Sequence, residues 1–281
     1  MNENQNSKLS CILDRVSYHA VYDKSIIDAL EYAHTNGFAG IQLAVESPHL
    51  SFETQSEVQL NKIAAFVETK GIHVAIHAPD EVTSLFQYSN YLRQGVMEYF
   101  QALFDFAARV HAQIITIHLG GVISYKTDTI PVIDVPAEDI PIFKDFVVKN
   151  LDMLIKLADN RFVICVENER VDDFVFSILQ PYLNDNKLAL CWDLAKSWNN
   201  PMEEEFFIKN LQHVKQVHLH DTRRFEKSNR RRHLVIGTGE MDFLRYLHKL
   251  SVADVLDYCI EVRPREKAKE SLEALKKMII S

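Results

Sequence analysis

The sequence lacks the features that mark membrane, secreted and general nucleic-acid-binding proteins. No apolar run among its 281 residues is long enough to cross a bilayer, and the polar start MNENQNSK has no apolar core of the kind found in signal peptides. An overall excess of basic charge is also missing, since the formal net charge is −8, which disfavours a broad surface for nucleic acid. We therefore expect a cytoplasmic protein without a membrane span, with at most a local basic patch.

Cysteine is scarce and shows no metal-binding or disulfide pattern. None of the four cysteines has CxxC spacing, and each falls in an apolar run that we expect to be a strand; they are Cys11, Cys165, Cys191 and Cys259. We interpret them as small buried residues in a reducing compartment. The composition is otherwise that of a globular protein, with 47% hydrophobic and 25% charged residues.

Apolar runs alternate with helix-like segments along the whole chain. The runs that we expect to be strands are residues 9–17, 38–43, 72–77, 113–118, 162–167, 188–193, 214–218 and 255–261. Amphipathic segments lie between them, and Gly37 and Gly71 are expected to end the first two helices. Strands separated by helices pair in parallel, so eight such units favour the α/β class and a closed (β/α)8 TIM barrel, with residues 1–281 as a single domain.

The alternative architecture is a doubly wound open sheet. It is less favoured because no glycine-rich dinucleotide fingerprint follows the first apolar run. Residues 220–238 are strongly charged, and we expect them to form a loop. No linker or low-complexity segment marks a domain boundary.

Six consecutive expected strands end on residue types that bind metal ions. These residues are His77, His118, Glu167, Asp193, His218 and Glu261. The carboxyl ends of parallel barrel strands meet at one face, where active sites form. One such histidine alone is ordinarily a hydrogen-bonded structural residue, but six buried polar groups without partners would be costly. We therefore expect these residues to form one site.

The donor types in this set favour a divalent ion. Carboxylates and imidazoles without thiolates suit Zn²⁺ or Mn²⁺ better than a redox cluster. The last four of the six residues could hold one ion. The two histidines before them could hold a second ion, with Glu167 as the bridge. The sequence thus predicts one or two divalent ions.

Short motifs at the expected strand ends resemble one known superfamily. They are GFAGIQL at 37–43, HAP at 77–79, IHLGG at 117–121, VENE at 166–169, WDLAKSW at 192–198, VHLHD at 217–221, GTGEMDF at 237–243 and IEVRP at 260–264. Their order resembles that of the xylose-isomerase-like barrel superfamily, which includes endonuclease IV, the ketose 3-epimerases, hydroxypyruvate isomerase and inosose dehydratase. The resemblance covers nearly the whole chain.

The resemblance implies two different metal arrangements. By resemblance to the epimerases, the last four of the six residues bind one metal, and Glu167 and Glu261 also act as acid and base. By resemblance to endonuclease IV, His77, His118 and Glu167 hold one zinc, and the same four residues hold a second. The chain departs from the third zinc site of that endonuclease: Lys196 stands in place of a histidine, and Arg231 in place of an aspartate before His233.

The substituted residues suggest contacts with substrate. Lys196, Arg231 and His233 would place positive charge where the endonuclease holds a cation, and such a cluster can hold a phosphate or carboxylate. The alternative is that Arg231 and its neighbours form a solvated charge run. The turn Gly237–Gly239 before a helix is a second candidate anion cradle, although such turns are common.

Three further residues are candidate substrate contacts. His220 is expected to face the same side as His218, although a hydrogen bond within the loop is the alternative. Arg263 is expected either to bind substrate or to pair with Glu261. Gln42 is expected either to contact substrate or to orient a metal ligand.

Three functions are compatible with these features. The preferred one is a metal-dependent isomerase or epimerase that acts on a small sugar, sugar acid or sugar phosphate by proton transfer next to a carbonyl. The first alternative is an endonuclease IV-like phosphodiesterase acting on abasic DNA, and the second is a non-catalytic metal-binding barrel. The expected partner is a small carbohydrate. The oligomeric state is left open, with a homo-oligomer among the alternatives.

Overall fold

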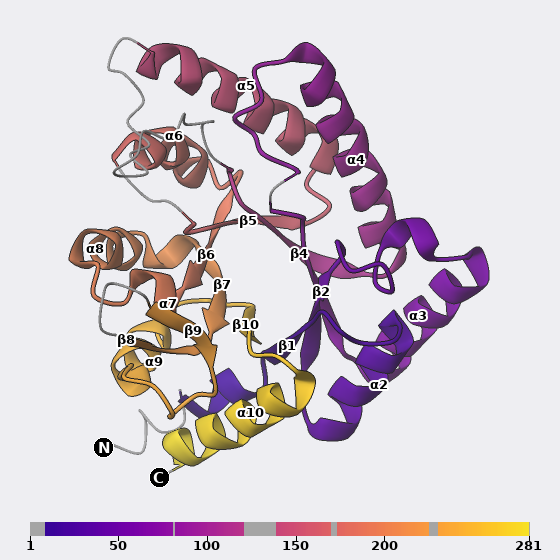
Figure 1. Ribbon diagram of the computed structural model, residues 1–281, viewed down its shortest axis with the longest axis vertical. Coiled ribbons are helices and arrows are strands. Elements are labelled where there is room, and N and C mark those ends of the chain that lie inside the picture. The colour runs from indigo at the N-terminus through magenta and orange to yellow at the C-terminus, as the bar shows by residue number, and fades with distance from the viewer. Residues whose placement is uncertain (1–8, 81, 121–138, 170–172, 225–229, 281) are drawn as a thin grey trace.

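The alternating apolar runs close into a parallel barrel with helices outside it (Figure 1). The computed structural model describes residues 9–80, 82–120, 139–169, 173–224 and 230–280. Around the barrel the strands follow the order β1-β10-β7-β6-β5-β4-β3-β2. They are Val16–Ala20 (β1), Gly40–Ala44 (β2), His73–His77 (β3), Ala112–Ile117 (β4), Val163–Glu167 (β5), Ala189–Asp193 (β6), Val214–Leu219 (β7) and Asp257–Ile260 (β10). The predicted (β/α)8 barrel is confirmed, and the open doubly wound sheet is wrong.

Helices connect successive strands and cover the outside of the barrel. They are Ile26–Asn36 (α2), Glu57–Lys70 (α3), Asn90–Arg109 (α4), Ile140–Ala158 (α5), Asp173–Asn184 (α6), Leu194–Ser197 (α7), Pro201–Lys209 (α8), Phe243–Leu250 (α9) and Arg265–Ile280 (α10), with 3-10 turns Phe52–Thr54 (η1) and Leu211–His213 (η2). Gly37 and Gly71 end α2 and α3 in the left-handed region, with φ of 75° and 64°, as predicted. None of the described helices is both long and apolar enough to span a membrane.

A column of polar side chains fills part of the barrel interior. At the amino-terminal ends of β3 and β10, His73 Nε2 lies 2.8 Å from Asp257 Oδ1, and Gln216 Nε2 donates to Asp257 Oδ2 at 2.7 Å. The Gln216 amide oxygen accepts from Thr116 and, at 3.3 Å, from Gln42 Nε2. Most of these polar groups have hydrogen-bond partners within the column, which makes their burial tolerable.

The first strand lies further along the chain than predicted. Residues 9–13 are helical, and β1 begins at Val16. Cys11 is therefore on a helix and exposed, whereas the other three cysteines are buried, and no disulfide joins any of the four. The shift also places His19 near the carboxyl end of β1, beside the other strand ends.

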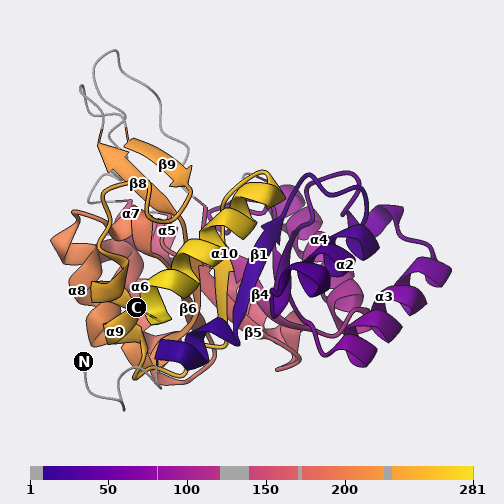
Figure 2. The same cartoon turned by 90° about the horizontal axis from the view of Figure 1, so that it is seen from below.

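The charged segment predicted to be a loop contains a β-hairpin. Asp221–Arg224 (β8) pairs antiparallel with Arg230–Leu234 (β9), and the hairpin projects from the end of the barrel where β7 finishes (Figure 2). Arg231 is in register with Arg223. The side chain of Arg231 lies outside the described residues, so its predicted substrate contact stays a prediction.

The Gly237–Gly239 turn binds an anion, but that anion is part of the chain. Asp221 Oδ2 accepts from the backbone N–H groups of Gly237 and Gly239 at 2.9 and 2.8 Å. Asp221 Oδ1 accepts from the N–H of Met241 at 3.2 Å. The idea of an external anion at this turn is therefore wrong, because the buried Asp221 carboxylate already uses its donors.

Candidate functional site

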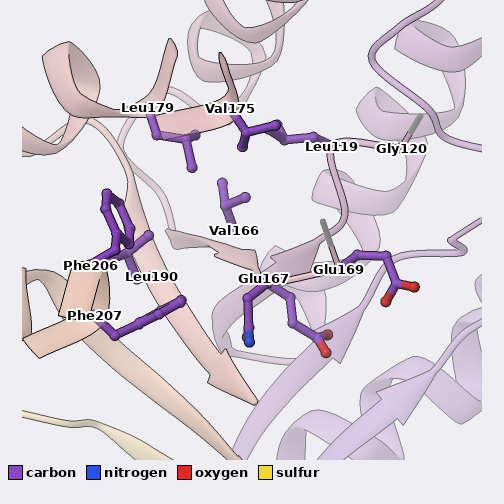
Figure 3. Close-up of a pocket in the computed structure, with 11 residues that line it drawn as sticks. Leu119, Gly120, Val166, Glu167, Glu169, Val175, Leu179, Leu190, Phe206 and Phe207 are labelled. Carbon is purple, nitrogen blue, oxygen red and sulfur yellow. The ribbon is translucent and has the colours of Figure 1, made fainter. Parts of the chain in front are cut away.

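The carboxyl ends of six barrel strands bring together the six predicted metal-ligand residues. His77, Glu167, Asp193 and His218 lie at or near the ends of β3, β5, β6 and β7, while His118 and Glu261 directly follow β4 and β10. All six are buried. The site forms here because side chains alternate along a strand, and Figure 3 shows the outward side chains of Val166 and Leu190 among leucines and phenylalanines, apart from the Glu167 carboxylate.

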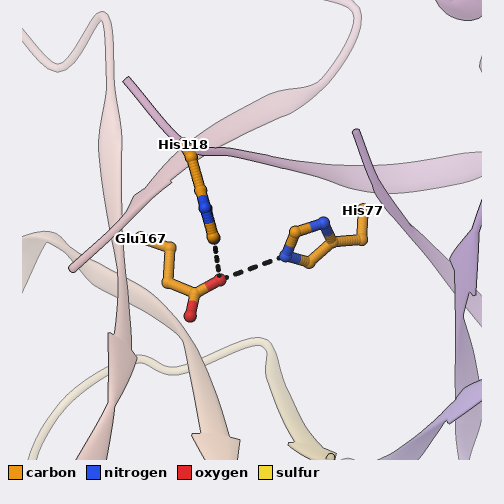
Figure 4. Close-up of side chains that lie close together, drawn as sticks. All are labelled: His77, His118 and Glu167. Atoms are coloured by element: carbon orange, nitrogen blue, oxygen red, sulfur yellow. Dashed lines mark hydrogen bonds and ion pairs between the residues drawn. The ribbon is translucent and has the colours of Figure 1, made fainter. Parts of the chain in front are cut away.

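Glu167 is the centre of the site. Its Oε2 atom lies 3.1 Å from His77 Nε2 and 2.8 Å from His118 Nε2 (Figure 4). His77 Nδ1 donates to the carbonyl of Ala78 at 2.9 Å, which fixes the ring with Nε2 facing the centre. This is how metal-binding histidines are commonly oriented in proteins.

The other oxygen of Glu167 is held by a lysine. Lys196 Nζ donates to Glu167 Oε1 at 2.5 Å and to Glu169 Oε2 at 2.6 Å. Burial by itself would raise the pKa of Glu167, but the charges of Lys196 and the nearby histidines hold it well below its usual value. Glu167 is therefore a carboxylate in this structure.

Asp193 faces both the helix that follows it and a histidine. Its Oδ1 atom accepts from the backbone N–H groups of Ala195 and Lys196, and so caps α7. His220 Nδ1 accepts from the backbone N–H of His233 at 3.0 Å, so the proton of His220 Nε2 points to Asp193 Oδ2 at 3.2 Å. His220 is fully buried behind Asp193, and it orients this carboxylate.

His218 carries a buried nitrogen without a hydrogen-bond partner. Its Nδ1 atom lies 3.4 Å from Glu167 Oε2 and 3.5 Å from Glu261 Oε2. Its Nε2 atom lies 3.1 Å from Gln42 Nε2, and the amide oxygen of Gln42 is also unpartnered. An ion at Nδ1 would require the Gln42 amide to rotate so that its oxygen accepts from His218 Nε2–H, in exchange for the hydrogen bonds that Gln42 Nε2 donates to Thr116 and Gln216. The donor set therefore fits a divalent ion, and buried Gln42 lies beneath the ligand rather than at an open surface.

Glu261 is held by a histidine that the sequence reasoning missed. His19 Nδ1 lies 3.3 Å from Glu261 Oε1, and Arg263 donates to the same oxygen at 3.2 Å. Burial raises the pKa of Glu261, but His19 and His218 hold it well below its usual value. The misplaced first strand hid His19; its position near the carboxyl end of β1 would have revealed it.

Asp80 and Cys191 also approach the site, and sequence reasoning assigned neither to it. Asp80 Oδ1 lies 3.5 Å from His77 Nδ1 and 3.3 Å from His118 Nδ1. Cys191 falls within ligand distance of Glu167 and His218, although burial raises the pKa of its thiol well above the usual value. The HAPD sequence after β3 was the available signal for Asp80.

Among the predicted substrate contacts, His233 and Arg263 are the more open ones. Their side chains are 40% and 34% exposed, while that of Lys196 is 12% exposed. His233 Nδ1 donates to the Glu261 carbonyl at 2.9 Å, and its ring lies 4.2 Å from the ring of His220. Both open side chains therefore border the Glu261 side of the site.

Several overlapping sets of these residues could hold a metal ion. Within the described residues, donor atoms close enough to share an ion occur in four sets: His77, His118, Glu167; Glu167, Cys191, His218; His220, His233, Glu261; and Glu167, Asp193, His218, Glu261. The four-residue set is the one predicted for a first ion. Glu167 belongs to three of the sets, so the sets compete for it.

The sequence matches one protein-family model. A sequence model described as the xylose isomerase-like TIM barrel matches residues 30–278. A search of curated protein sequences finds no match.

Solved structures with a similar fold include two epimerase-related proteins and a nuclease. A D-tagatose 3-epimerase-like protein has a TM-score of 0.74 and 18% identity, with 95% of this chain and 97% of that chain covered. The 3-keto-D-glucoside 4-epimerase of E. coli has a TM-score of 0.69 and 15% identity, with coverage of 94% and 99%. Endonuclease IV of Thermus thermophilus has a TM-score of 0.69 and 19% identity, with coverage of 95% and 99%. At these identities the likeness shows the fold alone.

Proposed function

Because this chain belongs to the xylose isomerase-like TIM barrel family, we propose that it is a divalent-metal-dependent isomerase or epimerase. Its substrate is a small sugar, sugar acid or sugar phosphate. The observation that carries the proposal is the placement of two carboxylates, Glu167 and Glu261, within 3.4 and 3.5 Å of the unpartnered His218 Nδ1. They come from separate strands, which suits the transfer of a proton between two sides of one carbon.

A bound divalent ion would neutralise charge that develops on a substrate oxygen and so acidify the adjacent carbon. Glu167, Asp193, His218 and Glu261 would hold it. The protein's own groups do the rest: one glutamate removes the proton and the other returns it. Lys196 and Arg263 each hold one oxygen of a glutamate, so the second oxygen keeps a fixed direction.

The residues at the opening favour an oxygen-rich ligand. Arg263 offers hydrogen-bond donors at the exposed side of Glu261, while His233, whose Nδ1–H is bound by the Glu261 carbonyl, offers its Nε2 as an acceptor. A guanidinium suits carboxylate or phosphate groups, and an imidazole acceptor suits the hydroxyl groups of a small carbohydrate. This supports the predicted substrate class without selecting one sugar.

The test replaces each glutamate and follows proton exchange. We expect Glu167→Gln and Glu261→Gln to bind less metal and to lose about 100-fold or more of the solvent-deuterium incorporation into a ketose, because each removes a ligand and a general base. NMR of a ketose panel in D2O measures exchange, and elemental analysis measures bound metal. Glu57→Gln is the matched control, since Glu57 pairs with Arg109 on the exposed surface. Unchanged exchange and metal content in both site variants contradicts the assignment.

A phosphodiesterase is the second candidate function, and one observation favours it. His77 and His118 both face Glu167 Oε2 and form a second set able to hold an ion. Two adjacent ions would suit attack on a phosphodiester. Incubation with a duplex that contains an abasic site separates the candidates: efficient incision that is lost in His77→Ala and His118→Ala would replace the isomerase proposal.

A further inference from the structure

Lys196 places a permanent positive charge among the candidate metal ligands. Its ammonium lies 2.5 Å from Glu167 Oε1, 2.6 Å from Glu169 Oε2 and 4.0 Å from Asp193 Oδ2. The lysine side chain is only 12% exposed. This charge is therefore largely shielded from water and interacts strongly with the carboxylates.

The local backbone holds this lysine in place. Asp193 caps α7, and the backbone N–H of Lys196 donates to Asp193 Oδ1 at 3.1 Å. The side chain then extends from the first turn of α7 toward β5, where Glu167 and Glu169 receive it. The position of the ammonium follows from the helix start rather than from a free surface side chain.

The buried charges balance with one divalent ion. The site contains three buried carboxylates, those of Glu167, Asp193 and Glu261. Adding the ammonium of Lys196 to these three negative charges leaves −2 when the histidines of the site are neutral, the form in which an imidazole binds metal. The partly exposed charges of Glu169 and Arg263 offset each other. One divalent cation neutralises that remainder, whereas a second would leave a net positive charge among buried groups. Uncompensated buried charge is unfavourable.

The geometry at Glu167 points the same way. A carboxylate that bridges two ions ordinarily gives one oxygen to each. Here Oε2 faces His77, His118 and His218, while Oε1 is bound by Lys196. An ion on the Oε1 side would have to displace the ammonium from Glu167.

We propose that Lys196 is a tethered cation that occupies one cation position, so that the site takes a single divalent ion. The inference rests on the metal dependence proposed above, but not on the reaction. It assigns Lys196 to the control of metal number rather than to direct contact with substrate.

The test counts ions in metal-free protein dialysed against Mn²⁺ and, separately, Zn²⁺. We expect one ion per chain in the wild type and two in Lys196→Met, with the first ion bound at least about tenfold more tightly in the variant because a nearby positive charge is gone. Lys196→Arg keeps the charge and should bind one ion. Lys209→Met is the matched control, because Lys209 forms an exposed ion pair with Glu205 and should also leave one ion.

Thermal unfolding supplies a second readout that does not depend on activity. Metal-free Lys196→Met should melt below the metal-free wild type, because its three buried carboxylates lack a buried cation. The rise in melting temperature on adding Mn²⁺ should be larger in the variant than in the wild type. The arginine variant should restore the wild-type behaviour.

Several outcomes overturn the inference. A wild type that binds two ions contradicts the inference, even if Lys196→Met fails to fold. A Lys196→Met variant that binds the same number of ions as the wild type with the same affinity also contradicts it. A wild type with one ion and no deuterium exchange on any sugar contradicts the proposed function but leaves the inference standing. Deuterium exchange on a sugar by a wild type that binds two ions contradicts the inference but leaves the proposed function standing.

Discussion

Two neighbouring histidines of the site differ in their preferred protonation. Burial lowers the pKa of His19 to about 4, even though Glu261 opposes this. Burial also lowers the pKa of His77, but Glu167 and Asp80 outweigh it and raise the value to about 9. Their rings lie 5.6 Å apart. The difference arises because His19 shares its carboxylate with Arg263, whereas His77 has two acidic neighbours.

The pKa of His19 predicts a loss of stability in acid. Above about pH 6.5 the histidine is neutral in both folded and unfolded chains, so it makes no difference. Between pH 6.5 and pH 4 only the unfolded chain takes up this proton, so the free energy of unfolding falls by up to about 3 kcal/mol. Urea unfolding of the metal-free protein at pH 7, 5.5 and 4.5 measures this fall. His19→Gln should make this fall in the free energy of unfolding smaller. An equal fall in the variant and the wild type would contradict the lowered pKa of His19.

At the scale of elements, the β8–β9 hairpin is joined to the turn before α9. Asp221 at the start of β8 accepts hydrogen bonds from Gly237, Gly239 and Met241. Such charge-assisted bonds are stronger than neutral ones. The hairpin that carries His233 therefore depends on this carboxylate for its position over the site.

A methyl group at Gly239 should disturb this connection. A Cβ atom there would overlap with the Asp221 carboxylate and the Thr222 carbonyl. We expect Gly239→Ala to lower the free energy of unfolding by about 1–3 kcal/mol, because packed backbone and a buried carboxylate must shift. Gly95→Ala is the control: its added methyl group meets no neighbour on α4, and the variant should gain about 1 kcal/mol. Chemical denaturation measures both changes, and equal stability of the two variants would refute the close contact.

At the scale of the whole molecule, the polar column connects the amino-terminal end of the barrel to the site at its carboxyl-terminal end. It runs from His73 through Asp257 and Gln216 to Gln42 and then His218. These residues lie on several different strands, so the column ties opposite sides of the barrel together. It therefore couples the stability of the barrel to the orientation of a candidate metal ligand.

Removing the centre of the column should destabilise the fold. Gln216→Met keeps a similar size but leaves Asp257 Oδ2 and the Thr116 hydroxyl without this amide. We expect a loss of about 2–4 kcal/mol in the free energy of unfolding, since buried polar groups lose their partners. Gln94→Met, on the exposed face of α4, should change it by less than about 0.5 kcal/mol. Urea titration compares them, and a small effect at Gln216 would argue against the column.

The barrel and the identity of its strand-end residues could be predicted from the amino-acid sequence. Both follow from local patterns: the alternation of apolar runs with amphipathic segments, and a metal-binding residue type at the end of each run from His77 to Glu261. Parallel strands in a closed barrel must bring those ends to one face. The helix ends at Gly37 and Gly71 were equally local, because glycine suits the left-handed cap.

The hydrogen-bond partner of each polar group, by contrast, follows from the three-dimensional fold. His19 reaches Glu261 across the closure of β1 against β10, and Lys196 reaches Glu167 on a neighbouring strand. The Asp221 carboxylate accepts a hydrogen bond from the backbone N–H of Gly237, sixteen residues later in the chain. Hydrogen bonds between residues far apart in sequence depend on side-chain directions and strand register. Local spacing constrains neither of these, so residue types could be predicted while their partners could not.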